Sequence, residues 1–175
     1  MIIAEQKRKE NIAEYLLYMY QIEDMIRANG LDIERVEQTL INKFELEYAL
    51  KREMREWYKG LISMMKDEGK EEKGHLSILL HQGEKMAEVH SQLLDQGRDP
   101  GYRELYEKAR PHLEALRMRS GYSRASDVQI ALDGLYGLLI LRLKKARISE
   151  ETTSAFATIR ELIAELNLRY MDGGQ

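Results

Sequence analysis

The chain has 175 residues, a net charge of −3 and no cysteine. The absence of cysteine excludes disulfides, thiolate metal sites and cysteine nucleophiles. The charge balance gives no electrostatic reason to expect a nucleic acid or an anionic membrane as the partner. A chain of this length can bury a self-supporting core, so we expect one helical domain over residues 1–175.

The first residues, MIIAEQKRKENIAEY, place charges where a secretory signal peptide needs an apolar stretch of about 7–15 residues. No uninterrupted apolar run elsewhere approaches the roughly 20 residues that span a bilayer. We therefore expect a cytoplasmic protein that does not enter a membrane.

The first predicted helix covers about residues 9–28 and ends at Asn29-Gly30, a common signal for a helix C-terminus. Its inward positions recur at helical spacing: Ile12, Leu16, Met19, Ile22 and Ile26. A second set widens the apolar surface: Tyr15, Leu17, Tyr18, Tyr20 and Met25. Such a helix contacts two neighbours, or one neighbour and a second subunit.

Residues 32–68 carry two apolar stripes that are out of phase with each other. The stripes are Ile33, Val36, Leu40 and Phe44, followed by Leu46, Leu50, Met54, Trp57, Leu61 and Met64. Either the helix breaks near Asn42, with Glu45 completing a capping pair, or one long helix buries different faces at its two ends. We favour the break.

Two further helices are expected, one over residues 71–96 and one from Pro100 onward. The first carries His90 within its apolar stripe. The second opens on a proline, whose fixed backbone angle suits a first helical turn. Pro111 removes one backbone hydrogen bond from this helix, so we predict a kink or a break near Arg110.

The segment Ser126–Ala146, which contains VQIALDGLYGLLILRL, is the one stretch that is apolar on every side. A helix of this kind must be surrounded by other helices or by lipid. Because Gln129, Asp133 and Arg142 interrupt it, we expect a buried central helix rather than a membrane span. Ser126 with Gln129 three residues later is typical of a capping box.

Gly134 and Gly137 lower the stability of this helix by roughly 1 kcal/mol each relative to alanine, and we expect them to admit a neighbouring backbone. A last helix begins at Ser149 and buries its apolar stripe of Phe156, Ile159, Leu162, Ile163 and Leu166. No segment has the pattern of a strand. The predicted fold is all-α, a single-domain bundle of about six helices around the central buried helix Ser126–Ala146.

Two stretches, NIAEYLLYMYQIEDMIRAN at residues 11–29 and LDGLYGLLILRLKKARISEET at residues 132–152, are distinctive as strings. Together with MIIAEQKRKEN at the start, they resemble an uncharacterised family of bacterial proteins known only as a domain of unknown function. The likeness runs along the whole chain. It implies a cytosolic, all-helical, single-domain bacterial protein, with no catalytic residues to carry over.

Two candidate sites contain histidine. Glu72 and His75 have the Glu-x-x-His spacing of di-iron carboxylate bundles, but such a site needs the motif twice, and no other histidine follows a glutamate by three residues. We therefore expect no metal and no cofactor. His90 is most simply a core residue that hydrogen-bonds to a carbonyl or a tyrosine hydroxyl. The alternative is a general base or a pH sensor, and no catalytic residue can be assigned.

The joint before the central helix is a candidate anion site. It reads RMRSGYSRAS and contains Arg117, Arg119, Ser123, Arg124 and Ser126. It ends at a helix N-terminus, whose free amides suit a phosphate or a carboxylate, and arginine can bind either with two hydrogen bonds. The simpler interpretation is that the arginines satisfy the carbonyls of one helix while Ser126 caps the next.

Self-association is the remaining candidate. The first helix and Trp57, Tyr58, Met64 and Met65 supply residue types that are enriched in interface cores, although a bundle can bury them internally. We predict a non-catalytic interaction or assembly protein, a homodimer with a possible further protein partner. The alternative is a small-molecule-binding bundle or an enzyme with its site near Arg119 and Arg124. An RNA-binding adaptor ranks third, because Lys7-Arg8-Lys9 is offset by nearby glutamates and nucleic acid is an unfavoured partner.

Overall fold

The computed structural model of the chain describes residues 2–95, 99–121 and 124–173. These residues form helices and connecting loops without a strand, which confirms the all-α prediction. The helices are α1 (Ile2–Glu10), α2 (Ile12–Ala28), α3 (Ile33–Thr39), the 3₁₀ turn η1 (Ile41–Lys43), α4 (Tyr48–Asp67), α5 (Ser77–Asp95), α6 (Pro100–Ser120), α7 (Asp127–Leu143) and α8 (Glu150–Asp172).

The expected number of about six helices is too low, because Ile2–Glu10 form an additional helix, α1, and residues 32–68 are divided. Asn11 has an extended backbone (φ −155°), and its side chain accepts the N–H of Glu14 at 2.9 Å, so it caps α2 and separates it from α1. The predicted break near Asn42 is confirmed, since α3 and η1 precede α4. The predicted capping pair is wrong, because the N-cap of α4 is Glu47, which makes no side-chain cap.

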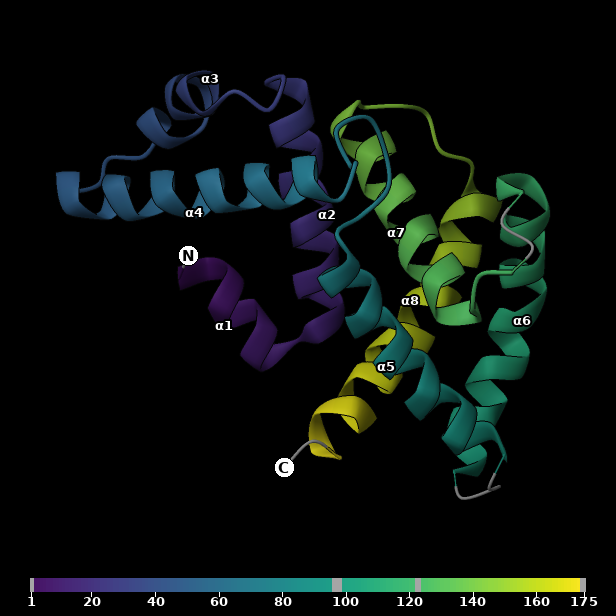
Figure 1. Ribbon diagram of the computed structural model, residues 1–175. Coiled ribbons are helices and arrows are strands. Elements are labelled where there is room, and N and C mark those ends of the chain that lie inside the picture. The colour runs from purple at the N-terminus through teal and green to yellow at the C-terminus, as the bar shows by residue number, and fades with distance from the viewer. Residues whose placement is uncertain (1, 96–98, 122–123, 174–175) are drawn as a thin grey trace.

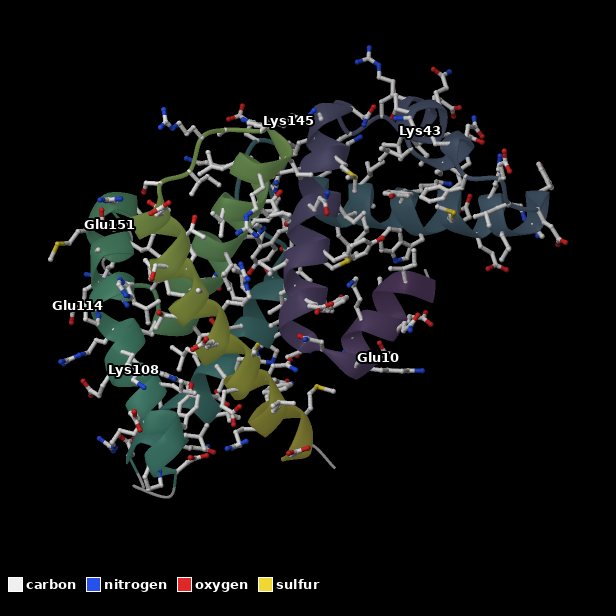
Figure 2. All side chains as sticks on the ribbon, turned by 180° about the vertical axis from the view of Figure 1, so that it is seen from behind. Glu10, Lys43, Lys108, Glu114, Lys145 and Glu151 are labelled. Atoms are coloured by element: carbon white, nitrogen blue, oxygen red, sulfur yellow. The ribbon has the colours of Figure 1, made fainter. Side chains whose placement is uncertain are left out.

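The helices form two parts that share α2. Helices α5, α6, α7 and α8 pack on one another and on one side of α2, whereas α1, α3 and α4 project from its other side (Figure 1). We call the projecting part the arm. Seen from behind, Lys43 in the arm and Lys108 on α6 lie at opposite ends of the molecule, and α1 meets α2 at an angle near Glu10 (Figure 2).

Helix α7 contacts α2, α5, α6 and α8, but it is not buried along its whole length. Its core positions fall mostly in its first half: Val128, Ile130, Ala131, Leu132, Leu135 and Leu138. At its C-terminal end Leu141 is 44% exposed and Leu143 is 58% exposed. The expectation of a helix surrounded over Ser126–Ala146 therefore fails for the second half, where no neighbouring helix covers the outer side.

Two local expectations about helix interiors, a break near Arg110 and a backbone close to Gly134 and Gly137, are not met. Helix α6 runs unbroken through Pro111, because it packs along α8 and buries Tyr102, Ala109 and Leu113 on its inner side while Pro111 is exposed. In α7 no backbone approaches the glycines. A Cβ on Gly134 would lie 2.8 Å from the Leu116 side chain and 3.2 Å from the Phe156 ring, and Gly137 faces open space.

Candidate functional site

Two residues of the predicted anion site, Arg117 and Ser126, make contacts within the fold. Arg117 donates to the backbone carbonyl of Ala125 and, at 2.6 Å, to Asp127. Ser126 accepts the N–H of Gln129 at 3.1 Å, which confirms it as the N-cap of α7. Arg119 and Arg124 are exposed, and Ser123 lies outside the described residues.

Arg124 and Ser126 line a groove of about 730 Å³ between α5 and the start of α7. Its α5 wall carries Glu84 and Glu88. These carboxylates oppose the arginine, so a bound anion would gain less from Arg124 here than in a purely basic pocket. The structure thus places two of the predicted residues together and ties Arg117 to an acidic partner.

His90 is a buried residue of α5. Its Nδ1 shares a hydrogen bond of 2.6 Å with the hydroxyl of Tyr102, as the core interpretation expects, and its ring meets the edge of Tyr106. Burial lowers the pKa of His90 below its usual value, against a smaller opposing effect of Asp127. Burial and the hydrogen bond to Asp127, 2.8 Å long, raise the pKa of Tyr106 to about 12.

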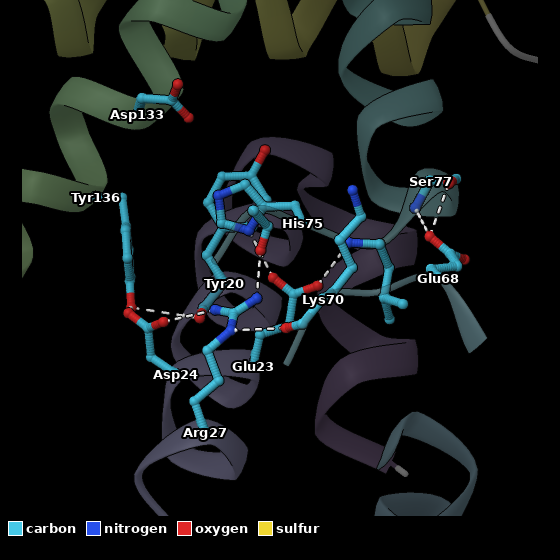
Figure 3. A network of polar contacts seen from close by, with 12 residues as sticks. Tyr20, Glu23, Asp24, Arg27, Glu68, Lys70, His75, Ser77, Asp133 and Tyr136 are labelled. Carbon is cyan, nitrogen blue, oxygen red and sulfur yellow. Dashed lines mark hydrogen bonds and ion pairs between the residues drawn. The ribbon is translucent and has the colours of Figure 1, made fainter. Parts of the chain in front are cut away.

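A polar network that the sequence analysis did not foresee joins α2 to the loop between α4 and α5 (Figure 3). Glu23 is completely buried, and its carboxylate accepts the N–H of Leu76 at 2.8 Å and meets Nδ1 of His75 at 2.5 Å. Tyr20 stacks on the His75 ring with centroids 3.5 Å apart. His75 therefore faces α2 and not Glu72, which is exposed.

Arg27 extends the same network one turn further along α2. It donates to the carbonyl oxygen of Lys70 at 3.1 Å and to that of Gly74, and it pairs with Asp24 at 2.7 Å. The loop is thereby fixed at several points, and this fixes where α5 begins. We conclude that the network positions Leu76 and the first turn of α5 beside the arm.

The arm contains a largely apolar concave surface. Between α1 and the segment that leads into α4 lies a groove of about 440 Å³. Its lining comprises Ile3, Phe44, Leu46, Leu50 and Met54, together with Glu5 and Glu53. A second hollow of about 250 Å³ adjoins it, since Glu5 lines both. Its lining includes Tyr15, Met19, Trp57, Leu61, Met64, Leu76, Ile78 and Leu79.

We call the two adjoining hollows the α1–α4 groove. Figure 1 shows α1 and α4 on the same side of α2. Several of its apolar side chains are substantially exposed: Ile3, Phe44, Leu46, Met64 and Ile78. Contiguous exposed apolar surface of this kind marks a site of interaction in soluble proteins.

Sequence analysis identified only part of this surface. It singled out Trp57 and Met64, but it assigned Phe44 and Leu46 to inward stripes. The sequence signal for the exposure of Phe44 and Leu46 was the phase break between the two stripes, because a residue that lies between two helices belongs to the buried face of neither. Phe44 ends η1 in an extended conformation and Leu46 lies in the non-helical link to α4, so both face outward.

Among the described residues no helix is long and apolar enough to cross a membrane. Comparison with curated proteins and with solved structures yields no match. One family model matches residues 1–175, and its description assigns no function. The chain belongs to the family described as Domain of unknown function (DUF4924).

Proposed function

We propose that this protein is a non-catalytic assembly protein of the cytoplasm that forms a homodimer through the α1–α4 groove. The observation that supports this most directly is the exposed apolar lining of the groove, which is contributed by α1, α4 and the start of α5. Its Tyr, Trp and Met content is that of an interface core. A twofold dimer is the commonest assembly of soluble proteins.

The occupant that fits the groove best is a second copy. Next to the groove, Tyr48 is 82% exposed at the start of α4 and continues the apolar surface of Phe44 and Leu46. A twofold contact pairs a surface with itself, so one copy must supply both the hollow and the side chains that fill it. The segment of residues 44–48 provides such side chains beside the hollow.

The charges around the groove are also self-complementary. Glu5 and Glu53 line it, and the basic side chains of Lys51 and Arg52 lie on the same first turns of α4. In a twofold arrangement the acidic side chains of one copy can face the basic side chains of the other. Such complementarity favours the matched orientation and disfavours other partners.

The test is the oligomeric state measured by sedimentation over a wide concentration range. We expect a monomer–dimer equilibrium that Leu46→Glu weakens by about a hundredfold, because a carboxylate would be buried in apolar surroundings. Leu168→Glu is the matched control, since Leu168 on α8 is 53% exposed, against 41% for Leu46, and lies outside the groove. A wild-type monomer at every concentration, or equal effects of the two variants, would refute the proposal.

A weak anion site at the joint is a second candidate, supported by the shared groove of Arg124 and Ser126. Titration with inorganic phosphate tests it, with the backbone amides of Ser126 and Gln129 followed by NMR. A saturable shift that Arg124→Ala abolishes would support the site. The absence of a shift at millimolar phosphate would end it.

A further inference from the structure

A second apolar groove, separate from the arm, lies where α2, α7 and α8 meet. Its volume is about 370 Å³, and its apolar lining includes Leu17, Leu135, Leu138, Leu139, Ile163 and Ala164. Four of these are leucines from two helices that are otherwise well packed. A concave apolar floor of this shape suits the apolar face of a helix.

The groove coincides with the half of α7 that its neighbours leave uncovered. Leu139 lines it, and the exposed Leu143 follows one turn later on the same face of the helix. Helix α7 is apolar around its whole circumference, so its second half places on the surface the same residue types that its first half buries. An additional helix laid against α7 would cover this surface.

The charges of this groove are predominantly positive. Arg142 and Arg160 line it, and both are exposed. Within the part of the chain that the structure describes, neither arginine has a carboxylate partner. Glu14, the one acidic side chain of the lining, is paired with Lys7 at 2.9 Å. The groove therefore offers unmatched positive charge beside an apolar floor.

The positive charge continues past the end of α7. Lys144, Lys145 and Arg147 follow Arg142 within five positions, and all are exposed. Lys145 marks the C-terminal tip of α7 in Figure 2. Sequence analysis missed this cluster, although four basic residues within six positions were a visible signal.

We propose that the α2–α7–α8 groove binds an amphipathic helix of another protein whose apolar face is flanked by acidic residues. Leucine-type side chains at positions i, i+3, i+4 and i+7 of that helix occupy the apolar floor. Its glutamates or aspartates pair with Arg142 and Arg160. The concave floor favours a helix over a lipid bilayer, which presents no matching ridge, and leucines offer no stacking surface for RNA bases.

The first experiment measures the binding of two fluorescein-labelled synthetic helices by anisotropy. Both carry leucines at i, i+3, i+4 and i+7, one with glutamates and one with lysines at the remaining positions. We expect the full chain to bind the glutamate peptide about tenfold more tightly than the lysine peptide, as two exposed ion pairs allow. No saturable binding of the glutamate peptide, or equal affinity for both, would overturn the proposal.

A steric variant and a charge variant locate the binding. Ala164→Trp fills the groove from an exposed position of α8, whereas Ala157→Trp adds the same side chain two turns earlier on α8 at an exposed site outside the groove. We expect only the first to abolish binding. The double variant Arg142→Glu and Arg160→Glu should bind the lysine peptide more tightly than the glutamate peptide. The control is the double variant Arg119→Glu and Arg124→Glu, which makes the same charge change at the joint and should keep the preference for the glutamate peptide.

Two further measurements separate the competing explanations. If phosphatidylglycerol vesicles displace the glutamate peptide and bind more tightly than it does, the partner of the groove is an anionic membrane and not a helix. The Leu46→Glu variant should keep full peptide affinity, because the two grooves lie on different helices. Peptide binding that disappears with the dimer would overturn the assignment of a separate site.

Discussion

Replacement of Glu23 by alanine should lower the free energy of unfolding by about 3–5 kcal/mol, the usual range for a lost buried acceptor together with a cavity. Glu23 has no exposed surface, and it holds two groups of the α4–α5 loop, the N–H of Leu76 and Nδ1 of His75. The alanine variant leaves the buried N–H without an acceptor and opens a cavity between α2 and the loop. Urea unfolding followed by circular dichroism measures the loss.

Two comparisons give this prediction its controls. Glu23→Gln keeps the shape and one acceptor, so it should lose only about 1–2 kcal/mol, the charged part of the hydrogen bonds. Glu14→Ala, on the same helix, removes the exposed ion pair with Lys7 and should change the stability by less than about 0.5 kcal/mol. If Glu23→Ala costs no more than Glu14→Ala, the network does not fix the loop as argued.

Three other perturbations test separate features. Burial holds the pKa of His90 below its usual 6.5, so protonation of the ring opposes folding. The free energy of unfolding should therefore fall as the pH drops below about 6.5. Unfolding curves of His90→Gln should show a weaker dependence of this free energy on pH. Burial raises the pKa of Asp133, so ionisation of this side chain weakens the fold as the pH rises above about 4. Asp133→Asn should raise the free energy of unfolding at pH 7 by less than about 1 kcal/mol, and this increase should disappear in acid. Lys145 has φ +54°, and Lys145→Gly should raise the melting temperature by relieving about 1 kcal/mol of backbone strain; an unchanged or lower value would contradict this.

Local sequence patterns predicted the start of a helix well where a single capping residue determines it. Ser126 and Ser149, where the last two helices were expected to begin, both act as N-caps, because a short oxygen-bearing side chain satisfies nearby N–H groups whatever surrounds it. The inward stripe of α8 is buried as expected. Asn11 was overlooked as a cap, since residues 5–11 are all polar and give no apolar pattern from which a helix before Asn11 could be predicted.

Features that depend on distant residues could not be read in this way. Glu23 and His75 are 52 positions apart, and no local pattern assigns one to the other. The burial of α7 depends on how many helices reach it, which its own composition does not specify. Arg117 suited an anion site by sequence, yet the fold pairs it with Asp127, ten positions later.

The contacts of α2 have a consequence for the order in which the chain acquires structure during synthesis. Some of its partners are made long after it: Asn167 accepts the N–H of Ala13, 154 positions earlier, and Tyr136 donates to Asp24, 112 positions earlier. At translation rates of about 5–20 residues per second, α2 waits on the order of ten seconds for them. Throughout that interval the side of α2 that α7 and α8 cover lacks these partners. We therefore expect the contacts of α2 with α1 to form first and those with α7 and α8 to form last.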